Sequence, residues 1–255
     1  MAVASGFVHE LTSGIVPSVI FGADKNRRHG NFHPASYRNI CANPEWARRL
    51  SKVHTASRRT RRADSWQWKE LDCANSSDAL LMNIFCHQPS VRNPALAAFL
   101  SIEPGTKPQF GFRPRIPLRD GKTDRTEIDM RLGNLLVEAK LTETNFQNAP
   151  VRLLERYRDF DEIFDREALP HFGELFTGYQ LIRGVLAAHA AGGAFSVICD
   201  ARRPDLVETW YGVMRAIRSC IQRCQSQLVT WQELGVLLTP PLQQFLAKKY
   251  GIVAA

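Results

Sequence analysis

Residues 126–141 read TEIDMRLGNLLVEAKL, and this stretch decides the fold. In residues 126–132, apolar Ile128, Met130 and Leu132 alternate with charged residues, and residues 135–141 alternate in the same way. A period of two is typical of β-strands. Between the two segments lies Gly133–Asn134, and glycine at the first position suits a two-residue type II′ turn. The stretch therefore predicts an antiparallel hairpin.

The turn also predicts which side chains face each other across the hairpin. Counting outward from residues 133 and 134 places Asp129 opposite Glu138. Facing side chains have Cβ atoms about 4.5–5.5 Å apart. Two carboxylates at that distance repel each other. A divalent cation held by both offsets the repulsion, and oxygen ligands of this kind suit Mg²⁺, for which Mn²⁺ is expected to substitute.

Two further charged residues share this face of the hairpin. Glu127 lies two residues before Asp129, about 6.8 Å along the strand, where it could hold a second ion or a bridging water. Lys140 lies opposite Glu127 and could orient an attacking water or stabilise negative charge on phosphorus. These groups meet the needs of metal-assisted phosphodiester hydrolysis. The alternative is a solvent-facing strand pair in which Glu127 and Lys140 form an ordinary ion pair.

At this point the residues resemble a known group of nucleases. Asp129, followed nine residues later by Glu138-Ala139-Lys140, resembles the signature of the PD-(D/E)xK, or restriction-endonuclease-like, superfamily. Residues 76–80, which read SSDAL, and Thr142-Glu143 after the lysine resemble an uncharacterised prokaryotic branch of it. Ile128 replaces the leading proline. The resemblance implies that Asp129 and Glu138 ligate Mg²⁺ with help from the Ala139 carbonyl, and that Lys140 is the catalytic lysine. It also implies an α/β fold with a mixed four-stranded sheet flanked by helices.

Two predicted helices extend the resemblance. Gln180 and Arg183 share one helix face; the resemblance implies that Gln180 reaches the active site, and Arg183 could hold a phosphate. The alternative is a polar edge on an amphipathic helix. Asp78 follows a predicted serine cap and is the candidate for a further metal ligand, with Glu70 as a weaker one. An acid in the first helical turn is also an ordinary partner of the helix dipole.

The order of predicted elements agrees with such a fold. Helices are expected over residues 76–85, 94–100, 151–164, 175–190, 206–225 and 241–249, and strands over 126–132, 135–141, 195–199 and 228–231. A sequence of helix, strands, helix, strand and helix favours a mixed sheet covered by helices.

Charge is concentrated at the start of the chain. Of the 255 residues, residues 1–65 hold 11 Lys and Arg against 4 Asp and Glu, a net charge of +7 out of +8 in total. We expect residues 1–64 to form a basic, largely irregular arm with one short helix near residues 44–53, and residues 65–255 to form the nuclease-like domain. A basic cluster attracts phosphate backbones; the alternative is a solvated tail without a partner. The cluster comprises Arg58, Arg59, Arg61 and Arg62.

The remaining expectations concern function and location. No apolar run reaches the roughly 18 residues of a membrane span, and the first residues lack the pattern of a signal peptide, so a cytoplasmic protein without membrane contact is expected. The hypothesis is a Mg²⁺-dependent nuclease acting on DNA, compatible with a homo-oligomer. Two alternatives stay open: a sequence-specific restriction endonuclease, and a catalytically inactive nucleic-acid-binding module on a nuclease-like fold.

Overall fold

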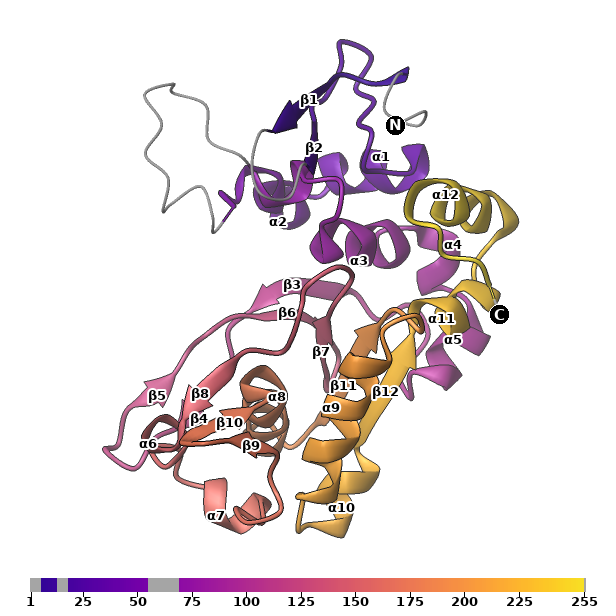
Figure 1. Ribbon diagram of the computed structural model, residues 1–255. Helices are drawn as coiled ribbons and strands as arrows, with labels where there is room; N and C mark the ends of the chain where they lie inside the picture. The colour runs from indigo at the N-terminus through magenta and orange to yellow at the C-terminus, as the bar shows by residue number, and fades with distance from the viewer. Residues whose placement is uncertain (1–5, 13–17, 55–68, 255) are drawn as a thin grey trace. The chain divides into compact units, whose positions relative to one another are not determined.

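The computed structural model describes residues 6–12, 18–54 and 69–254, which form two compact units (Figure 1). Unit 1 combines Met1–Gly105 with Leu234–Ala255, and unit 2 spans Thr106–Glu233. The basic cluster of residues 58–62 lies outside the described residues, as does the boundary expected near residue 65. The hairpin that decided the fold lies in unit 2.

Unit 2 is built on a five-stranded mixed sheet with the strand order β12-β11-β7-β6-β3. Strand β7 is antiparallel to β6 and parallel to β11, which in turn is parallel to β12. The strands are β3 (Pro108–Phe112), β6 (Ile128–Leu132), β7 (Leu135–Ala139), β11 (Ala194–Cys199) and β12 (Ser226–Thr230). A mixed α/β sheet flanked by helices is therefore confirmed, with one more strand than expected.

The additional strand is β3, at the edge of the sheet. It pairs with β6 in antiparallel fashion, and its first residue is Pro108. Proline has no N–H to donate, so it is tolerated at the first residue of an edge strand. The strand was not predicted, because the prolines around this segment give it a pattern that is typical of loops.

The predicted hairpin turn is confirmed by the register. Leu132 pairs with Leu135, and Met130 pairs with Val137. Gly133 has a φ of 59°, in the left-handed region that the first position of the turn requires. The expected alternation holds in β6, whereas every residue of β7 is buried. Strand β7 is central in the sheet, so both of its faces are covered.

Helix α8 (Tyr179–Ala190) packs against β7 and β11 (Figure 1). The helix lies close to the sheet because Gly184 has no side chain: a Cβ there would lie 2.2 Å from Cζ of Phe195. Trp210 of helix α9 (Pro204–Arg215) contacts the same ring, with the ring centroids 5.9 Å apart. These residues belong to the hydrophobic core of unit 2.

Three long helices expected from the apolar pattern are shorter in the structure. Residues 151–164 form only α6 (Val151–Leu154) and α7 (Phe160–Ile163). Residues 175–177 form strand β10 (Leu175–Thr177), because Gly178, with a φ of 75°, separates them from α8. Residues 206–225 are divided between α9 and α10 (Cys220–Cys224). Apolar residues at helical spacing also occur in irregular segments that bury them in the core.

The other short elements of this part are β4 (Ile116–Pro117), β5 (Thr123–Asp124), β8 (Asn148–Pro150), β9 (His171–Phe172) and α11 (Trp231–Val236), which leads back into unit 1.

The described residues of unit 1 form a hairpin and several short helices where an irregular arm was expected. The short helix expected near residues 44–53 is present, as two consecutive segments over residues 44–47 and 48–51. The elements are β1 (His9–Thr12), β2 (Ser18–Phe21), α1 (Pro34–Ala42), α2 (Pro44–Ala47), η2 (Arg48–Ser51), η4 (Glu70–Asp72), α3 (Ser77–Phe85), α4 (Gln88–Val91), α5 (Pro94–Phe99) and α12 (Pro240–Tyr250).

Buried amide side chains join the parts of unit 1. Asn83 of α3 donates to the Asn31 carbonyl at 2.8 Å, and Asn31 donates to the carbonyls of Leu71 and Cys73. The Tyr250 hydroxyl donates to the same Asn31 carbonyl at 3.1 Å, so the last helix belongs with the first segments. The predicted serine cap is confirmed, because Oγ of Ser76 accepts from the first turn of α3. Such long-range amide contacts leave no periodic trace in the sequence.

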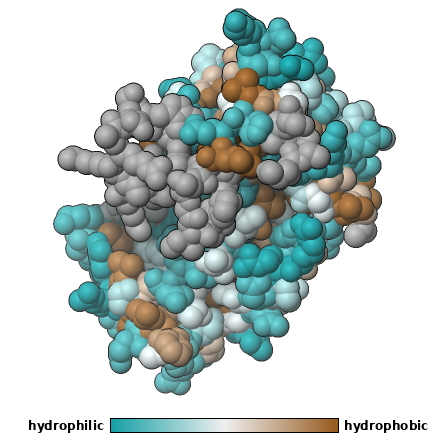
Figure 2. Space-filling view, turned by 45° about the horizontal axis from the view of Figure 1, so that its top comes forward, coloured by the Kyte–Doolittle hydropathy of each residue, from teal (hydrophilic) through white to brown (hydrophobic). Residues whose placement is uncertain are grey.

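The surface carries hydrophobic side chains in small separate groups among hydrophilic ones, on the face that Figure 2 shows. Mixed surfaces of this kind are normal, so polar clusters are the better guide to a functional site. Within the described ranges, no helix has the length and apolar character needed to cross a membrane.

Candidate active site

A buried ion pair lies at the end of β7. Glu138 is 2% exposed and Lys140, directly after the strand, is 6% exposed. Nζ of Lys140 donates to Oε1 of Glu138 at 2.8 Å. Charged residues are rarely buried unless they are paired. The alternative of a solvent-facing strand pair is therefore wrong for these two residues.

Asp129 lies beside this pair on the neighbouring strand. The pairs of β6 with β7 end at Met130 and Val137, so the next position along the register sets Asp129 against Glu138. At this position, Oδ2 of the Asp129 side chain accepts a hydrogen bond of 2.8 Å from the Ala139 N–H. This bond holds the carboxylate at the end of β7.

Gln180 reaches the same cluster from the first turn of α8. Its Nε2 donates to Oε1 of Glu138 at 2.7 Å, as the resemblance implied for this glutamine. The start of α8 is held in place because the Gln180 N–H donates to the Phe146 carbonyl at 3.0 Å. Glu138 therefore points toward α8 and receives two donors on one oxygen.

The charges around Lys140 decide its protonation state. Burial by itself lowers the pKa of a lysine, but the negative charges of Glu138 and Asp129 outweigh it and raise the pKa of Lys140 above its ordinary value. Its ammonium also lies 5.7 Å from the ring centre of Phe146. The indole N–H of Trp231 donates to the Lys140 carbonyl at 2.8 Å, which fixes the backbone at this point. The negative charges of the two carboxylates thus favour the protonated, cationic form of Lys140.

Arg183 has a different environment from the one expected. It is 2% exposed, and its guanidinium donates to the carbonyls of Thr126 and Glu127 at 2.9 and 3.0 Å. It therefore holds the chain just before β6, and contact with a phosphate would require these bonds to be replaced. Glu127 itself is half-buried. A phosphate role for Arg183 stays a prediction that this geometry does not support.

Asp78 lies in unit 1, in the first turn of α3. Its Oδ2 accepts from Arg49 at 2.6 Å, and Nζ of Lys52 lies 3.6 Å away. Lys52 also pairs with Glu70, the weaker candidate, at 2.7 Å. Both acids are therefore paired with basic residues of their own unit, and a metal-binding role for Asp78 stays a prediction.

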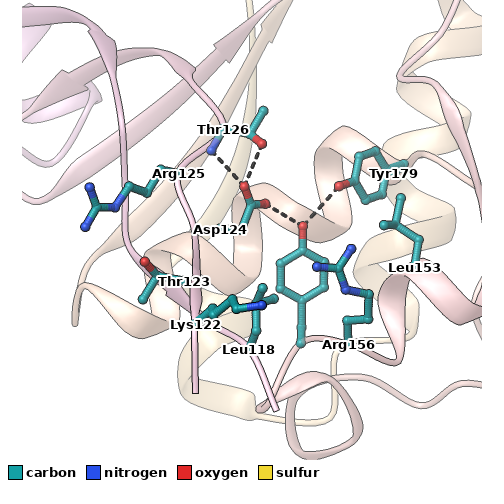
Figure 3. Close-up of a pocket in the computed structure, with 10 residues that line it drawn as sticks. Leu118, Lys122, Thr123, Asp124, Arg125, Thr126, Leu153, Arg156 and Tyr179 are labelled. Carbon is teal, nitrogen blue, oxygen red and sulfur yellow. Dashed lines mark hydrogen bonds between the residues drawn. The ribbon is translucent and has the colours of Figure 1, made fainter. Parts of the chain in front are cut away.

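A second polar cluster beside the site was not predicted. Asp124 accepts from both the N–H and the hydroxyl of Thr126, and from the Tyr157 hydroxyl at 2.6 Å (Figure 3). The Tyr157 and Tyr179 oxygens are 3.0 Å apart. The Asp-x-Thr spacing predicts a local turn of this kind, but the tyrosines join it only through the fold.

The mixed sheet and the carboxylate–lysine cluster at its hairpin define a class, that of restriction-endonuclease-like α/β proteins. The model of a protein family described as "Restriction Endonuclease associating with ARP" matches residues 16–251, and the chain belongs to this family. No curated protein and no solved structure matches the chain. Membership of a restriction-endonuclease family indicates a nuclease whose substrate is nucleic acid.

Proposed function

We propose that this protein hydrolyses phosphodiester bonds in DNA with the help of Mg²⁺, for which Mn²⁺ substitutes. The observation that carries the proposal is the buried cluster of Glu138, Lys140 and Gln180 beside Asp129. A purely structural ion pair in this position has little advantage, because a buried pair is often no more stable than apolar residues of similar volume. A catalytic role accounts for the presence of these buried charges.

The residues present fit a small hard cation. Both hydrogen bonds that Glu138 accepts within the described part of the chain go to Oε1, and Oε2 is the oxygen proposed to bind the ion. In residues 6–12, 18–54 and 69–254, no group of three or more His, Cys, Asp or Glu side chains forms a metal cluster. Mg²⁺ needs only one or two carboxylates, because it keeps several waters and binds substrate phosphates. Asp129, Glu138 and the Ala139 carbonyl are the proposed ligands.

When bound, the ion would polarise the phosphate and lower the pKa of an attacking water. The chain's own residues do the rest. The Ala139 N–H and the Gln180 amide orient the two carboxylates, so that their geometry is set before substrate binds. The Lys140 ammonium offers positive charge where the phosphorane develops, and preorganised charge of this kind stabilises a transition state. Glu127 is proposed to contribute through a bridging water or a second ion.

Several finer assignments also belong to the proposal. The arginines at positions 58, 59, 61 and 62 would bind phosphate backbones through counterion release. The description of the family favours a restriction endonuclease over a general nuclease, and it names association with ARP, which is proposed for this chain as well. Homo-oligomer formation stays a prediction.

The test is cleavage of linear and circular plasmid DNA with Mg²⁺, with Mn²⁺ and with EDTA. We expect the wild type to cleave only with metal and Glu138→Ala to be inactive. Glu208→Ala, on the exposed face of α9, is the matched control and should cleave normally. Discrete bands would indicate a restriction endonuclease, and end-dependent loss of linear DNA would indicate an exonuclease.

Two results would contradict the proposal. Full activity of Glu138→Ala would mean that the active site lies elsewhere. Absence of cleavage by the wild type, with DNA still retarded in a gel, would favour the inactive binding module instead.

A further inference from the structure

A pocket of about 330 Å³ lies beside the first turn of α8, next to the candidate active site (Figure 3). Its walls come from the β4–β5 hairpin, the segment before β6, helix α6 and the chain after it, and Tyr179 at the start of α8. Leu118 pairs with Tyr157 and the Arg119 N–H donates to the Arg156 carbonyl at 2.8 Å, so the walls are joined by the backbone. The pocket is a fixed feature of unit 2.

The rim of the pocket is basic. Lys122, Arg125 and Arg156 line it, and all three are exposed. Lys122 lies 3.5 Å from Asp120 in a solvent-exposed pair, which binds weakly. Within the ranges that the structure describes, Arg125 and Arg156 form no side-chain ion pair. In the view of Figure 3, Arg125 extends to the side of Asp124 away from Arg156. The rim therefore suits an anion, with Lys122 and Arg156 on one side.

The wall of the pocket offers a hydrogen-bond acceptor. Burial raises the pKa of Asp124, but hydrogen bonds from Thr126 and Tyr157 outweigh it, so that the pKa lies below its usual value and the group is a carboxylate. Tyr157 must donate its single hydroxyl hydrogen to that carboxylate. Tyr179 must then donate to the Tyr157 oxygen, 3.0 Å away. The Tyr179 oxygen keeps its lone pairs for a donor in the pocket.

The pocket is close enough to the active site to hold the same substrate. Tyr179 is adjacent to Gln180, which contacts Glu138. Thr126 lines the pocket and lies three residues before Asp129, a span of at most about 11 Å. Successive nucleotides rise about 3.4 Å along a strand of DNA. Arg156 also borders a second hollow, in which Arg119 and Arg152 lie among the acids Asp120 and Glu155, so basic side chains continue beyond the pocket.

We propose that this pocket binds one nucleotide of the substrate strand, within a few steps of the phosphodiester that is cleaved. The proposal rests on the proposed nuclease function and extends it. Lys122 and Arg156 contact the phosphate, and the Tyr179 oxygen accepts a hydrogen bond from an N–H or O–H group of the nucleoside. The pocket thereby positions the strand, and Asp124 and Tyr157 orient the Tyr179 hydroxyl without touching DNA.

The first test measures binding without catalysis. A fluorescein-labelled single-stranded DNA of twelve nucleotides is titrated with the full chain in EDTA, by anisotropy, at several salt concentrations. For Lys122→Gln/Arg156→Gln we expect affinity to fall about tenfold, and the slope of log K against log salt to decrease by about 1.4 for two lost phosphate contacts. Arg215→Gln, an exposed arginine at the end of α9, is the matched control and should bind like the wild type.

The second variant tests the uncharged hydrogen bond between the Tyr179 oxygen and the nucleoside. Tyr179→Phe removes the hydroxyl but keeps the ring, and Tyr157 keeps its bond to Asp124. We expect affinity to fall several-fold with an unchanged salt slope, because a neutral hydrogen bond releases no counterions. Circular dichroism spectra identical to that of the wild type would confirm that these substitutions leave the fold intact.

The outcomes separate this proposal from the proposed function. The proposal for the pocket is wrong if Lys122→Gln/Arg156→Gln has the DNA affinity and salt slope of the wild type. It is also wrong if the wild type does not bind the oligonucleotide. If binding is lost as expected but Glu138→Ala still cleaves, the pocket stands and the catalytic assignment fails. If Glu138→Ala is inactive but the pocket variants bind normally, the nuclease stands and the pocket is wrong.

Discussion

Replacing Glu138 and Lys140 singly and together separates their structural and catalytic roles. The pair is buried, with side chains 3% and 7% exposed and a contact of 2.8 Å. Removal of one partner leaves the other charge buried, which costs about 3–5 kcal/mol of stability. We expect Glu138→Gln and Lys140→Met each to lose this amount. The double variant removes both charges of the pair, so neither remains buried without its partner. It should therefore lose less stability than either single variant, with a coupling energy of about 3 kcal/mol.

The assay combines urea unfolding in EDTA with cleavage of plasmid DNA in Mg²⁺. Trp231, one of the five tryptophans of the chain, donates to the Lys140 carbonyl, so tryptophan fluorescence includes a signal from this part of unit 2. All three variants should be inactive, including the stable double variant. The control is Asp161→Asn, because Asp161 pairs with Arg119 at 2.6 Å but both side chains are more than half exposed. An exposed pair contributes less than about 1 kcal/mol.

Either half of the reasoning can be refuted alone. If the losses of the two single variants add up in the double variant, the side chains do not interact as the structure describes. If the double variant cleaves DNA at the wild-type rate, the geometry stands but the two residues are not catalytic.

Three further predictions concern residues that stabilise the fold. Gly184→Ala brings a Cβ to 2.2 Å from Phe195 and should cost about 1–3 kcal/mol through overpacking, seen as a lower Tm. Arg183→Met removes two charged hydrogen bonds to carbonyls before β6 and should cost about 3 kcal/mol or more in urea unfolding, with cleavage reduced as Asp129 loses its support. Partial burial lowers the pKa of Lys249 to about 8, so below pH 8 the native state carries the cost of keeping this half-buried side chain charged. As pH rises from 8 to about 10.4 only the native state loses the proton, and wild-type stability should rise relative to Lys249→Met.

Each of these three predictions would be contradicted by one particular result. An unchanged Tm for Gly184→Ala would show that α8 can move away from β11. Wild-type stability of Arg183→Met would mean that water replaces the guanidinium at no cost. A stability difference between wild type and Lys249→Met that stays constant from pH 7 to 10 would contradict burial of the ammonium.

The hairpin and its acids could be predicted from the sequence, because they depend on local properties. Alternation with a period of two and a glycine in the turn set the register of β6 and β7, and the register sets Asp129 against Glu138. The Ser76 cap was predictable for the same reason, since cap and helix are adjacent in the chain. By contrast, β3 and two helices of unit 1, α1 and α4, carry weak local patterns and were missed.

What joins distant parts of the chain was decided only by the tertiary structure. Gln180 contacts Glu138 across 42 positions, and Arg183 contacts Thr126 across 57, because α8 lies on β7 at one particular angle and height. Periodicity predicts that a helix has a polar face, but not which carboxylate or carbonyl that face meets. The same holds for the Tyr179 hydroxyl and its neighbours in the pocket. The sequence by itself determined the hairpin chemistry, and packing of the helix on the sheet decided which residues surround it.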